Sequence, residues 1–398
     1  MYLRKFTTKI LPIILTLTTV TSLTILSLLY AKGYRLNFNY NNKSNERLKN
    51  QGKTPKIAIK RTGILAVRSI PEGAKIYLNN ELKEITNATI TSLDPGEYNL
   101  RVEKEGFETW EKKIQVYQDL VTDITAVLIL KGSGLNPLTN SGVTDFALSD
   151  NGELLAYTSK GIEKPGLWVL KLSNNPINIF QNTKKVVAID KPSFLYSLGN
   201  NIQWSPDNEQ ILIQSKFGSY YLLSLQKPAN QSPLVLKDAT EILKKWELKR
   251  QKDKKSIVES LDIDKKLKEI AISKKAIWSP DGEKFYTLID KGDKKELYTY
   301  NYEKPLQVGE KRENLTYIFE KSKEDIPNIF WYSDSKHLIF VYKNSLKLIE
   351  IDGNNLTEIF NGLIIGKKAY PTPFGDRLII LSKFKEDAPA NLYTVSIR

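Results

Sequence analysis

The 398-residue chain contains no cysteine and a single histidine, His337. The missing cysteines exclude disulfides, thiol catalysis, zinc sites with cysteine ligands and iron–sulfur clusters. A single histidine excludes metal sites built from several imidazoles and leaves His337 as the one candidate base for a Ser–His–Asp triad. We therefore expect no metal and no cofactor. This composition still allows enzymes that work with paired carboxylates, which need neither residue.

The motifs of nucleotide and hydrolase sites are missing as well. The sequence has no Walker loop, no Gly-x-Gly-x-x-Gly fingerprint, no nucleophile elbow, no His-Glu-x-x-His and no EF-hand loop. Lys and Arg number 59 against 45 Asp and Glu, a formal net charge of +14. Hydrophobic residues make up 41% of the chain, enough for folded cores. We predict two or three folded domains. We also predict that the protein is not an enzyme.

Residues 10–30 carry no charged side chain. Their number matches the roughly 20 residues that a helix needs to cross about 30 Å of hydrocarbon. Arg4, Lys5 and Lys9 precede the segment, which favours a cytoplasmic N-terminus. We therefore predict a short cytoplasmic tail at 1–9, a single transmembrane helix at 10–30, and a cell-membrane protein whose bulk is extracytoplasmic. A cleaved signal peptide is the alternative to a retained anchor, and it also exports the chain.

The next hundred residues divide into a polar segment and a segment in which apolar and polar residues alternate. Residues 31–61 are rich in Asn, Lys and Gln and contain few apolar residues, which predicts a solvated stalk or linker. Between 62 and 130 apolar and polar residues alternate, as in Leu65, Val67 and Ser69, and turn signals such as Glu105-Gly106 separate the runs. The second part is therefore predicted to be a small β-sandwich.

This sandwich segment resembles the PEGA domain family. Pro71-Glu72-Gly73-Ala74 reproduces the defining tetrapeptide, and Pro95-Gly96-Glu97-Tyr98 and Lys104-Glu105-Gly106-Phe107 follow at the family's spacing. The resemblance implies a surface-exposed module of bacterial and archaeal envelope proteins, and it carries over no catalytic residue. For Phe107 and Trp110 we expect core positions, with a carbohydrate-stacking platform as the alternative.

The remainder of the chain repeats a strand–turn–strand unit. The best copy is Trp278-Ser279-Pro280-Asp281-Gly282, and related units begin at Phe146, Gln203, Phe330 and, in degenerate form, Pro371. Ser and Asp side chains cap amides in such turns, Pro fixes φ, and Gly or Asn accepts the left-handed position. We therefore expect these residues to be structural, and we do not expect Asp207, Asp281 and Asp334 to form a metal site.

The repeats resemble the WD-like β-propeller of the TolB type. The resemblance implies four-stranded blades around a central channel over residues 135–398. We predict about five blades, with six as the alternative if 173–200 forms another sheet. Fourth strands are predicted at 176–180, 234–236, 315–319 and 356–360. The last repeat is followed by no fourth strand, so 135–139 is predicted to complete the final blade and close the ring.

A helical insertion at 239–275 interrupts the propeller repeats. Apolar residues recur at helical spacing, as in Ile242 with Trp246 and Ile263 with Leu267, which predicts two amphipathic helices in an otherwise all-β fold. The simplest interpretation of its many basic residues is a solvated face. A docking surface for an acidic partner or for anionic lipid headgroups is the sharper one, and nucleic acid is not expected, because acidic residues interleave. The candidate docking residues are Lys249, Arg250, Lys252, Lys254 and Lys255.

Together these features predict a membrane-anchored envelope protein that binds other proteins or cell-wall and surface polymers without catalysis. The alternative is a carbohydrate-active propeller enzyme, a glycosidase or lyase, with carboxylates at the channel mouth. Two or more convergent carboxylates beside Arg or Tyr would favour the enzyme. A mouth lined by small uncharged residues would favour binding.

Overall fold

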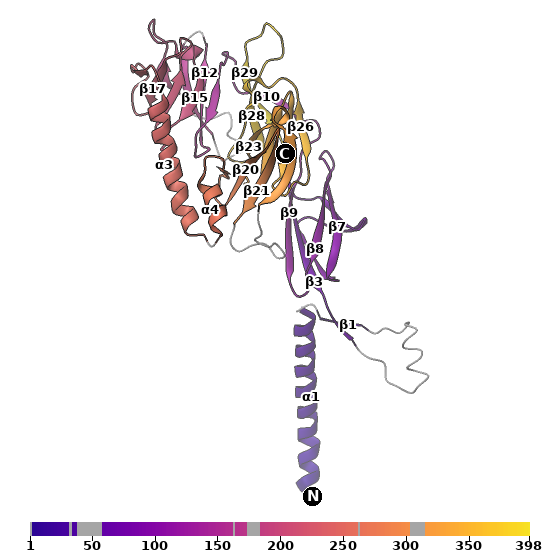
Figure 1. Ribbon diagram of the computed structural model, residues 1–398. Coiled ribbons are helices and arrows are strands. Elements are labelled where there is room, and N and C mark those ends of the chain that lie inside the picture. Colours follow the sequence, from indigo (N-terminus) through magenta and orange to yellow (C-terminus); the bar gives the residue numbers. More distant parts are fainter. Residues whose placement is uncertain are drawn as a thin grey trace. The chain divides into compact units, whose positions relative to one another are not determined.

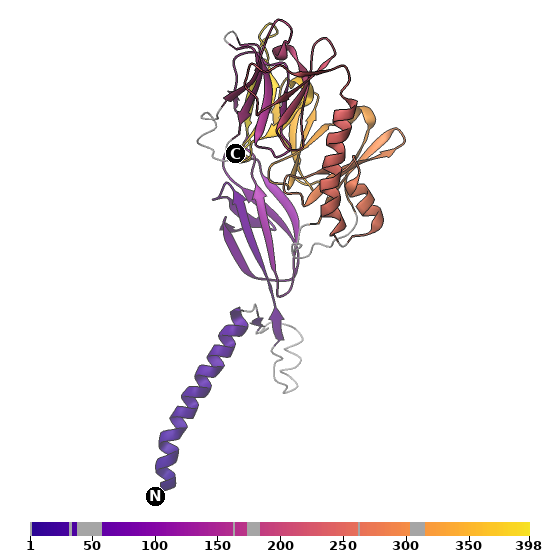
Figure 2. The same ribbon diagram turned by 90° about the vertical axis from the view of Figure 1, so that its left-hand side faces the viewer.

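The computed structural model describes residues 2–31, 34–37, 58–161, 164–172, 184–261, 263–302 and 315–398. Figures 1 and 2 show the chain from two sides. It divides into two compact units, of which the first contains residues 1–105 and 109–128 and the second contains most of 129–398.

The N-terminal helix α1 (Tyr2–Ala31) does not fit the predicted transmembrane helix. Its described side chains run from Ile14 to Leu28, and seven of these fifteen residues are Thr or Ser. The Thr21 hydroxyl, for example, donates to the Leu17 carbonyl at 2.9 Å. These hydroxyl-bearing residues lower the mean hydropathy of this part of the helix. Within the part of the chain that the structure describes, no helix is long and apolar enough to cross a membrane, so the transmembrane helix predicted at 10–30 is wrong.

Two short strands lie within the predicted stalk, near its two ends. β1 (Tyr34–Asn37) pairs antiparallel with β2 (Ala58–Arg61), with Tyr34 opposite Arg61. Residues 38–57, which make up most of the predicted stalk at 31–61, lie outside the described residues.

A small two-sheet sandwich completes the first unit. Its strands are β3 (Gly63–Ile70), β4 (Lys75–Leu78), β5 (Glu81–Ile85), β6 (Ala88–Leu93), β7 (Gly96–Glu103), β8 (Trp110–Val116) and β9 (Val121–Val127). One sheet has the order β6-β3-β9, with β3 and β9 parallel, and the other has the order β5-β4-β7-β8. Trp110 is only 4% exposed, so its predicted core position is confirmed and a carbohydrate platform there is wrong.

The second unit contains five antiparallel four-stranded sheets among its described residues. Sheet 1 contains β11 (Phe146–Leu148), β12 (Leu154–Ser159), β13 (Gly166–Lys171) and β14 (Lys184–Ile189). Sheet 2 contains β15 (Asn200–Trp204), β16 (Gln210–Gln214), β17 (Tyr220–Ser224) and β18 (Leu234–Leu236). Sheet 3 contains β19 (Ile277–Trp278), β20 (Lys284–Lys291), β21 (Lys294–Asn301) and β22 (Thr316–Ser322). Sheet 4 contains β23 (Asn328–Trp331), β24 (His337–Tyr342), β25 (Ser345–Glu350) and β26 (Thr357–Asn361).

Sheet 5 joins the two ends of this unit. It contains β27 (Ala369–Pro371), β28 (Arg377–Ser382), β29 (Asn391–Ser396) and, from the start of the unit, β10 (Leu135–Pro137). Leu135 lies opposite Val395, and the Leu138 amide donates to the Leu392 carbonyl at 2.8 Å. The predicted closure by residues 135–139 is confirmed, and this strand order is that of a β-propeller.

The first sheet differs from its prediction at the fourth strand. The segment 176–180 lies outside the described residues, whereas β14, which begins at Lys184, pairs with β13. The pairing places Ala188 opposite Leu167. The described part of 173–200 therefore supplies the fourth strand of sheet 1 and the first residue of β15, and no sixth sheet.

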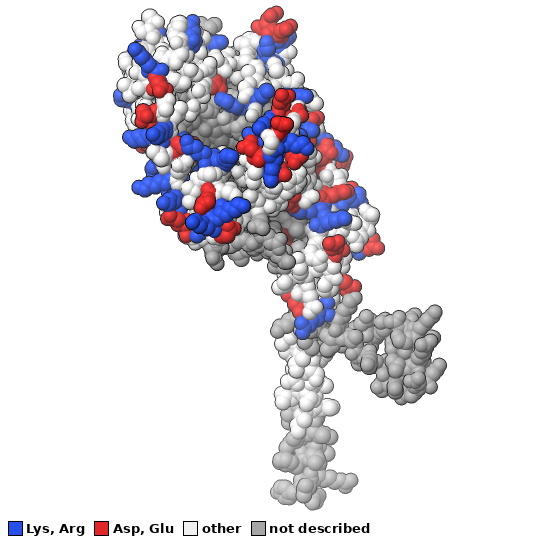
Figure 3. Space-filling view, viewed as in Figure 1, with Lys and Arg blue, Asp and Glu red and all other residues white. Residues whose placement is uncertain are grey.

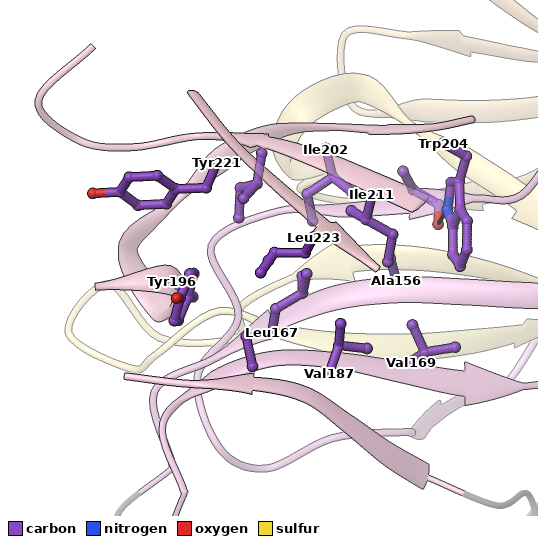
Figure 4. Close-up of a cluster of buried hydrophobic side chains, with 13 residues drawn as sticks. Ala156, Leu167, Val169, Val187, Tyr196, Ile202, Trp204, Ile211, Tyr221 and Leu223 are labelled. Carbon is purple, nitrogen blue, oxygen red and sulfur yellow. Dashed lines mark hydrogen bonds between the residues drawn. The ribbon is translucent and has the colours of Figure 1, made fainter. Parts of the chain in front are cut away.

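Neighbouring sheets pack through apolar side chains of both. Leu167, Val169 and Val187 of sheet 1 pack with Ile211 and Leu223 of sheet 2 (Figure 4). A tryptophan adds a hydrogen bond to this interface, because Trp204 Nε1 of sheet 2 donates to the Ala147 carbonyl of sheet 1 at 3.0 Å. Trp331 Nε1 of sheet 4 makes the same bond to the Ile277 carbonyl of sheet 3 at 2.9 Å. These two tryptophans therefore tie sheet 2 to sheet 1 and sheet 4 to sheet 3.

The repeated turn is held by its own side chains, as expected. Ser205 Oγ donates to Asp207 Oδ1 at 2.5 Å, and the Glu209 amide donates to the same oxygen at 3.1 Å. These hydrogen bonds, that from Ser205 above all, lower the pKa of Asp207. Ser279 and Asp281 repeat the arrangement in sheet 3.

Candidate docking surface on the helical insertion

Two helices form the insertion that the spacing of apolar residues predicts. They are α3 (Thr240–Glu259) and α4 (Lys265–Ile272), and they pack against each other. Asp264 caps α4, because its side chain accepts a hydrogen bond from the Leu267 amide at 3.0 Å. Neither helix contains Pro or Gly, so nothing interrupts either of them.

The helices contact sheet 2 on one side and sheet 3 on the other. Trp246 of α3 is 7% exposed and packs with Leu212 of sheet 2. Val258 of α3 and Ala271 of α4 are fully buried in a cluster with Phe285 of sheet 3. The insertion therefore lies between two consecutive sheets of the propeller (Figure 1).

The hydrogen bond of Trp278 shows which contact between sheets the insertion replaces. Trp204 and Trp331 each donate to a carbonyl of the preceding sheet. Trp278 of sheet 3 instead donates to the Ala271 carbonyl of α4 at 2.9 Å. Helix α4 therefore offers sheet 3 the acceptor that a preceding sheet offers elsewhere in the unit.

Two of the five predicted docking residues serve this attachment. Arg250 Nε donates to Asp150 Oδ2 at 2.6 Å, and its Nη2 donates to the Trp204 carbonyl at 2.7 Å. Lys254 Nζ donates to the Ala276 carbonyl at 3.3 Å, and burial lowers the pKa of Lys254. Arg250 and Lys254 thus face sheets 1, 2 and 3.

The spacing of residues along α3 contains the signal for this inward orientation. Ile242, Trp246, Arg250, Lys254 and Val258 follow one another at intervals of four, so they form one continuous row that winds around α3, each residue about 40° from the next. Ile242 and Trp246 mark that row as the apolar face of an amphipathic helix. Arg250 and Lys254 belong to this row, although their charge alone predicts an exposed position.

The other three predicted docking residues are exposed. Lys249 pairs with Asp253 at 2.8 Å and Lys255 with Glu259 at 3.5 Å, and both lysine side chains are 60% exposed. Lys252 is exposed as well. Figure 3 shows Lys and Arg side chains gathered over α3, with acidic residues among them. Such exposed pairs contribute little to stability, so these lysines are available to a partner.

Leu248 stands at the centre of the exposed side. It is 57% exposed, and four exposed lysines lie within two turns of it on the same side of the helix. We call this group, Leu248 with Lys244, Lys245, Lys252 and Lys255, the lysine face. Over residues 237–275 there are thirteen Lys and Arg and eight Asp and Glu, a net charge of +5. Over a third of the net charge of the chain therefore lies in about a tenth of its length.

On the inner side of the propeller, one equivalent position of each sheet can be compared. First strands of neighbouring sheets contact each other, β11 with β15 and β23 with β27, so they line the inner side. At the third residue before the tryptophan of the repeat, or before its equivalent, the five sheets carry one acid, two amides and two lysines. These residues are Asp145, Asn201, Lys275, Asn328 and Lys368.

The single acid of this set, Asp145, is fully engaged. Its Oδ1 accepts hydrogen bonds from Lys368 Nζ at 2.7 Å and from the Phe146 amide at 2.8 Å, and its Oδ2 accepts one from the Ile202 amide at 3.1 Å. Asp145 thereby links sheets 1, 2 and 5. Among the described residues no group of three or more His, Asp and Glu could hold a metal ion.

His337 follows a repeat turn as the first residue of β24 and is 5% exposed. Its Nδ1 is 2.7 Å from Asp334 Oδ2, while Asp334 Oδ1 accepts hydrogen bonds from the Lys336 and His337 amides. Both oxygens of the Asp334 carboxylate therefore have partners in or beside the turn. This arrangement agrees with a structural role for His337.

Comparisons with known proteins bear on the two units differently. The PEGA domain family matches residues 62–130. TolB from Acinetobacter baumannii is 13% identical over 75% of this chain, which covers 60% of that protein, with a TM-score of 0.27. The putative TolB from Agrobacterium tumefaciens is 15% identical, with coverages of 69% and 75% and a TM-score of 0.23.

A third solved structure, the AfRom2 CNH domain, is 8% identical, with coverages of 66% of this chain and 98% of that one and a TM-score of 0.31. Scores this low mean that these chains superpose poorly as wholes. The propeller assignment rests on the strand order and the closing pair described above. No curated protein matches the chain.

Proposed function

We propose that the chain is a non-catalytic binding protein of the cell envelope that acts outside the cytoplasm. The match of residues 62–130 to the PEGA domain supports the envelope location. The exposed lysine face supports a binding role, because solvated cations on one face attract anionic partners.

The state of Asp145 carries the non-catalytic part of the proposal. Glycoside cleavage needs two carboxyl groups about 5–9.5 Å apart, one of them able to give up a proton to the substrate. At the five equivalent inner positions the chain has one carboxylate, and a lysine and two amides hold it. This arrangement supports a structural acid and gives no support to a catalytic pair.

The enzyme alternative is tested on envelope polysaccharides from the native source. We expect the full-length chain to release no reducing ends and no unsaturated sugars from them. Turnover by the wild-type chain would contradict the proposal, whichever residue proved responsible. The variant Asp145→Asn would then show whether the inner carboxylate takes part.

The location is tested on intact native cells with a non-permeating protease. We expect the chain to be cut before a cytoplasmic marker protein is. Protection of the chain until the cells are lysed would contradict an extracytoplasmic location.

A further inference from the structure

We infer that the lysine face of α3 docks an acidic segment of a partner protein, one that carries an apolar side chain among its carboxylates. The inference rests on the proposed binding function and names the partner. Lys244 and Lys245 lie one turn before Leu248, Lys252 lies one turn after it, and Lys255 lies two turns after it. The result is an apolar centre with a rim in which four lysines outnumber one exposed acid in the same range, Glu241, two turns before Leu248.

The opposite side of α3 holds the lysine face in place. Trp246 and Val258 are buried against different sheets. Arg250 donates to the Trp204 carbonyl of sheet 2, and Lys254 donates to the carbonyl of the residue just before β19 of sheet 3. The helix therefore needs no ordering when a partner binds, which removes one of the entropic costs of association. A rigid helix also keeps the rim lysines at a constant spacing around Leu248.

Charge complementarity selects an anionic partner. The four rim lysines are exposed, and the pair that Lys255 forms with Glu259 at 3.5 Å is itself open to solvent. The surrounding residues 237–275 keep a net charge of +5. A partner that brings carboxylates to this rim gains both attraction at long range and direct ion pairs on contact.

The apolar residues of α3 distinguish between classes of anionic partner. A helix that lies in a bilayer interface needs one broad apolar face. In α3 the aromatic Trp246 is buried, and the exposed Leu248 and Ile257 are nine residues apart, about 180° around the helix. A lipid surface therefore finds no apolar stripe, and a purely anionic polymer leaves Leu248 uncovered. An acidic protein segment with an apolar side chain covers both the rim and its centre.

Photo-crosslinking in native cells tests this inference. A benzophenone amino acid replaces Leu248 in the full-length chain, and the matched control replaces Phe217, which is 75% exposed in a turn of sheet 2. We expect an adduct from position 248 and none from 217. The crosslinked partner peptide should have a net negative charge and contain an aliphatic or aromatic residue.

Charge variants of the same crosslinker chain complete the test. Lys244→Gln, Lys245→Gln, Lys252→Gln and Lys255→Gln together should lower the adduct yield by about tenfold or more. Lys265→Gln with Lys266→Gln, two exposed lysines of α4, should leave it within about twofold. Thermal unfolding midpoints within about 2 °C of each other show that the variants fold alike.

Several outcomes overturn the inference. They are an adduct to lipid or polysaccharide, an adduct to a peptide without acidic residues, equal yields from 217 and 248, the absence of an adduct, and a yield that the four substitutions do not change. If a partner still co-isolates with the chain, the lysine face is wrong and the proposed binding function survives. If envelope glycans are turned over, the proposed function itself fails.

Discussion

At the scale of single residues, the guanidinium of Arg250 joins parts of the chain that are far apart in sequence. It makes two hydrogen bonds to the Asp150 carboxylate, at 2.6 and 3.3 Å, and one to the Trp204 carbonyl at 2.7 Å. The Arg250 side chain is 28% exposed and that of Asp150 is 38% exposed, so solvent weakens the charge attraction. The hydrogen bond to the Trp204 carbonyl is part-buried, whereas those to Asp150 are exposed, so solvent weakens it less.

Replacing Arg250 therefore costs more than replacing its neighbour. We expect Arg250→Gln to lower the free energy of unfolding by about 1–2 kcal/mol, through the lost bond to the Trp204 carbonyl and the weakened ion pair. Lys249→Gln removes only an exposed pair on the same helix and should change it by less than about 0.5 kcal/mol. Urea unfolding measures both, and equal effects would contradict the structural role of Arg250.

Asp334 provides a residue-level prediction about acid. Burial acts to raise the pKa of Asp334, but the charge and hydrogen bonds of His337, together with two amides, outweigh it and lower the pKa. A carboxyl whose pKa is lower in the folded chain stabilises that chain at pH values above its unfolded pKa of about 3.9. This contribution is lost as the pH falls through the lower folded value.

Asp334→Asn isolates that contribution. We expect the wild type to be more stable than the variant at pH 7, by about 1–3 kcal/mol, and the difference to shrink as the pH falls below about 4. Unfolding by urea at a series of pH values measures the difference. A difference that stays constant down to about pH 2 would show that the ionised carboxylate does not matter.

At the scale of elements, the interfaces between sheets depend on the tryptophan bond. For Trp278 the acceptor belongs to α4, and for Trp331 it belongs to β19 of sheet 3. Trp278→Phe should therefore cost about 1–3 kcal/mol and speed amide exchange in α4. Trp331→Phe is the matched control, because its effect on exchange should fall on β19 and spare α4. Exchange measured by mass spectrometry separates the two, and unchanged exchange in α4 after Trp278→Phe would contradict its attachment.

The closing strand is a second element whose role can be measured. Thr139 is 7% exposed, and its hydroxyl accepts a hydrogen bond from the Leu392 amide at 2.9 Å and donates one to Asn391 Oδ1 at 3.3 Å. Thr139→Ala leaves both groups without this partner and should lower the unfolding free energy by about 1–3 kcal/mol. Thr139→Ser keeps the hydroxyl and should cost less than half as much. Equal losses for the two variants would assign the effect to the methyl group and not to the closing contact.

Periodicity predicted the elements better than it predicted their partners. The repeated turns indicated the first strands of the sheets, and the pairing of 135–139 with the last repeat followed from strand counting. The fourth strand of sheet 1 was misplaced, because Pro176 begins an apolar run as strand-like as that of Val186. Two of the five candidate docking residues, Arg250 and Lys254, donate hydrogen bonds to the propeller, which their charge does not indicate. Charge alone does not say whether Arg250 faces solvent or a main-chain carbonyl, and only its row with Trp246 indicates that.

At the scale of the whole molecule, the propeller unit is five sheets and a pair of helices between two of them. Helix α4 accepts a hydrogen bond from Trp278 of sheet 3, and Arg250 of α3 donates hydrogen bonds to sheets 1 and 2. The insertion is therefore an integral part of the propeller unit. The side of the insertion that contacts the sheets stabilises the unit, whereas its exposed side faces solvent. The exposed lysine face is the side of the insertion that we propose binds a partner.

The central claim, that the chain binds an acidic protein and does not react with it, is tested most directly by native mass spectrometry. The full-length chain is isolated from envelopes of its own cells at low and at high salt. We predict a discrete complex with an acidic protein at low salt that dissociates at high salt, because ion pairs at an exposed rim are screened. The chain alone at every salt concentration, or a complex that high salt leaves intact, would contradict the account.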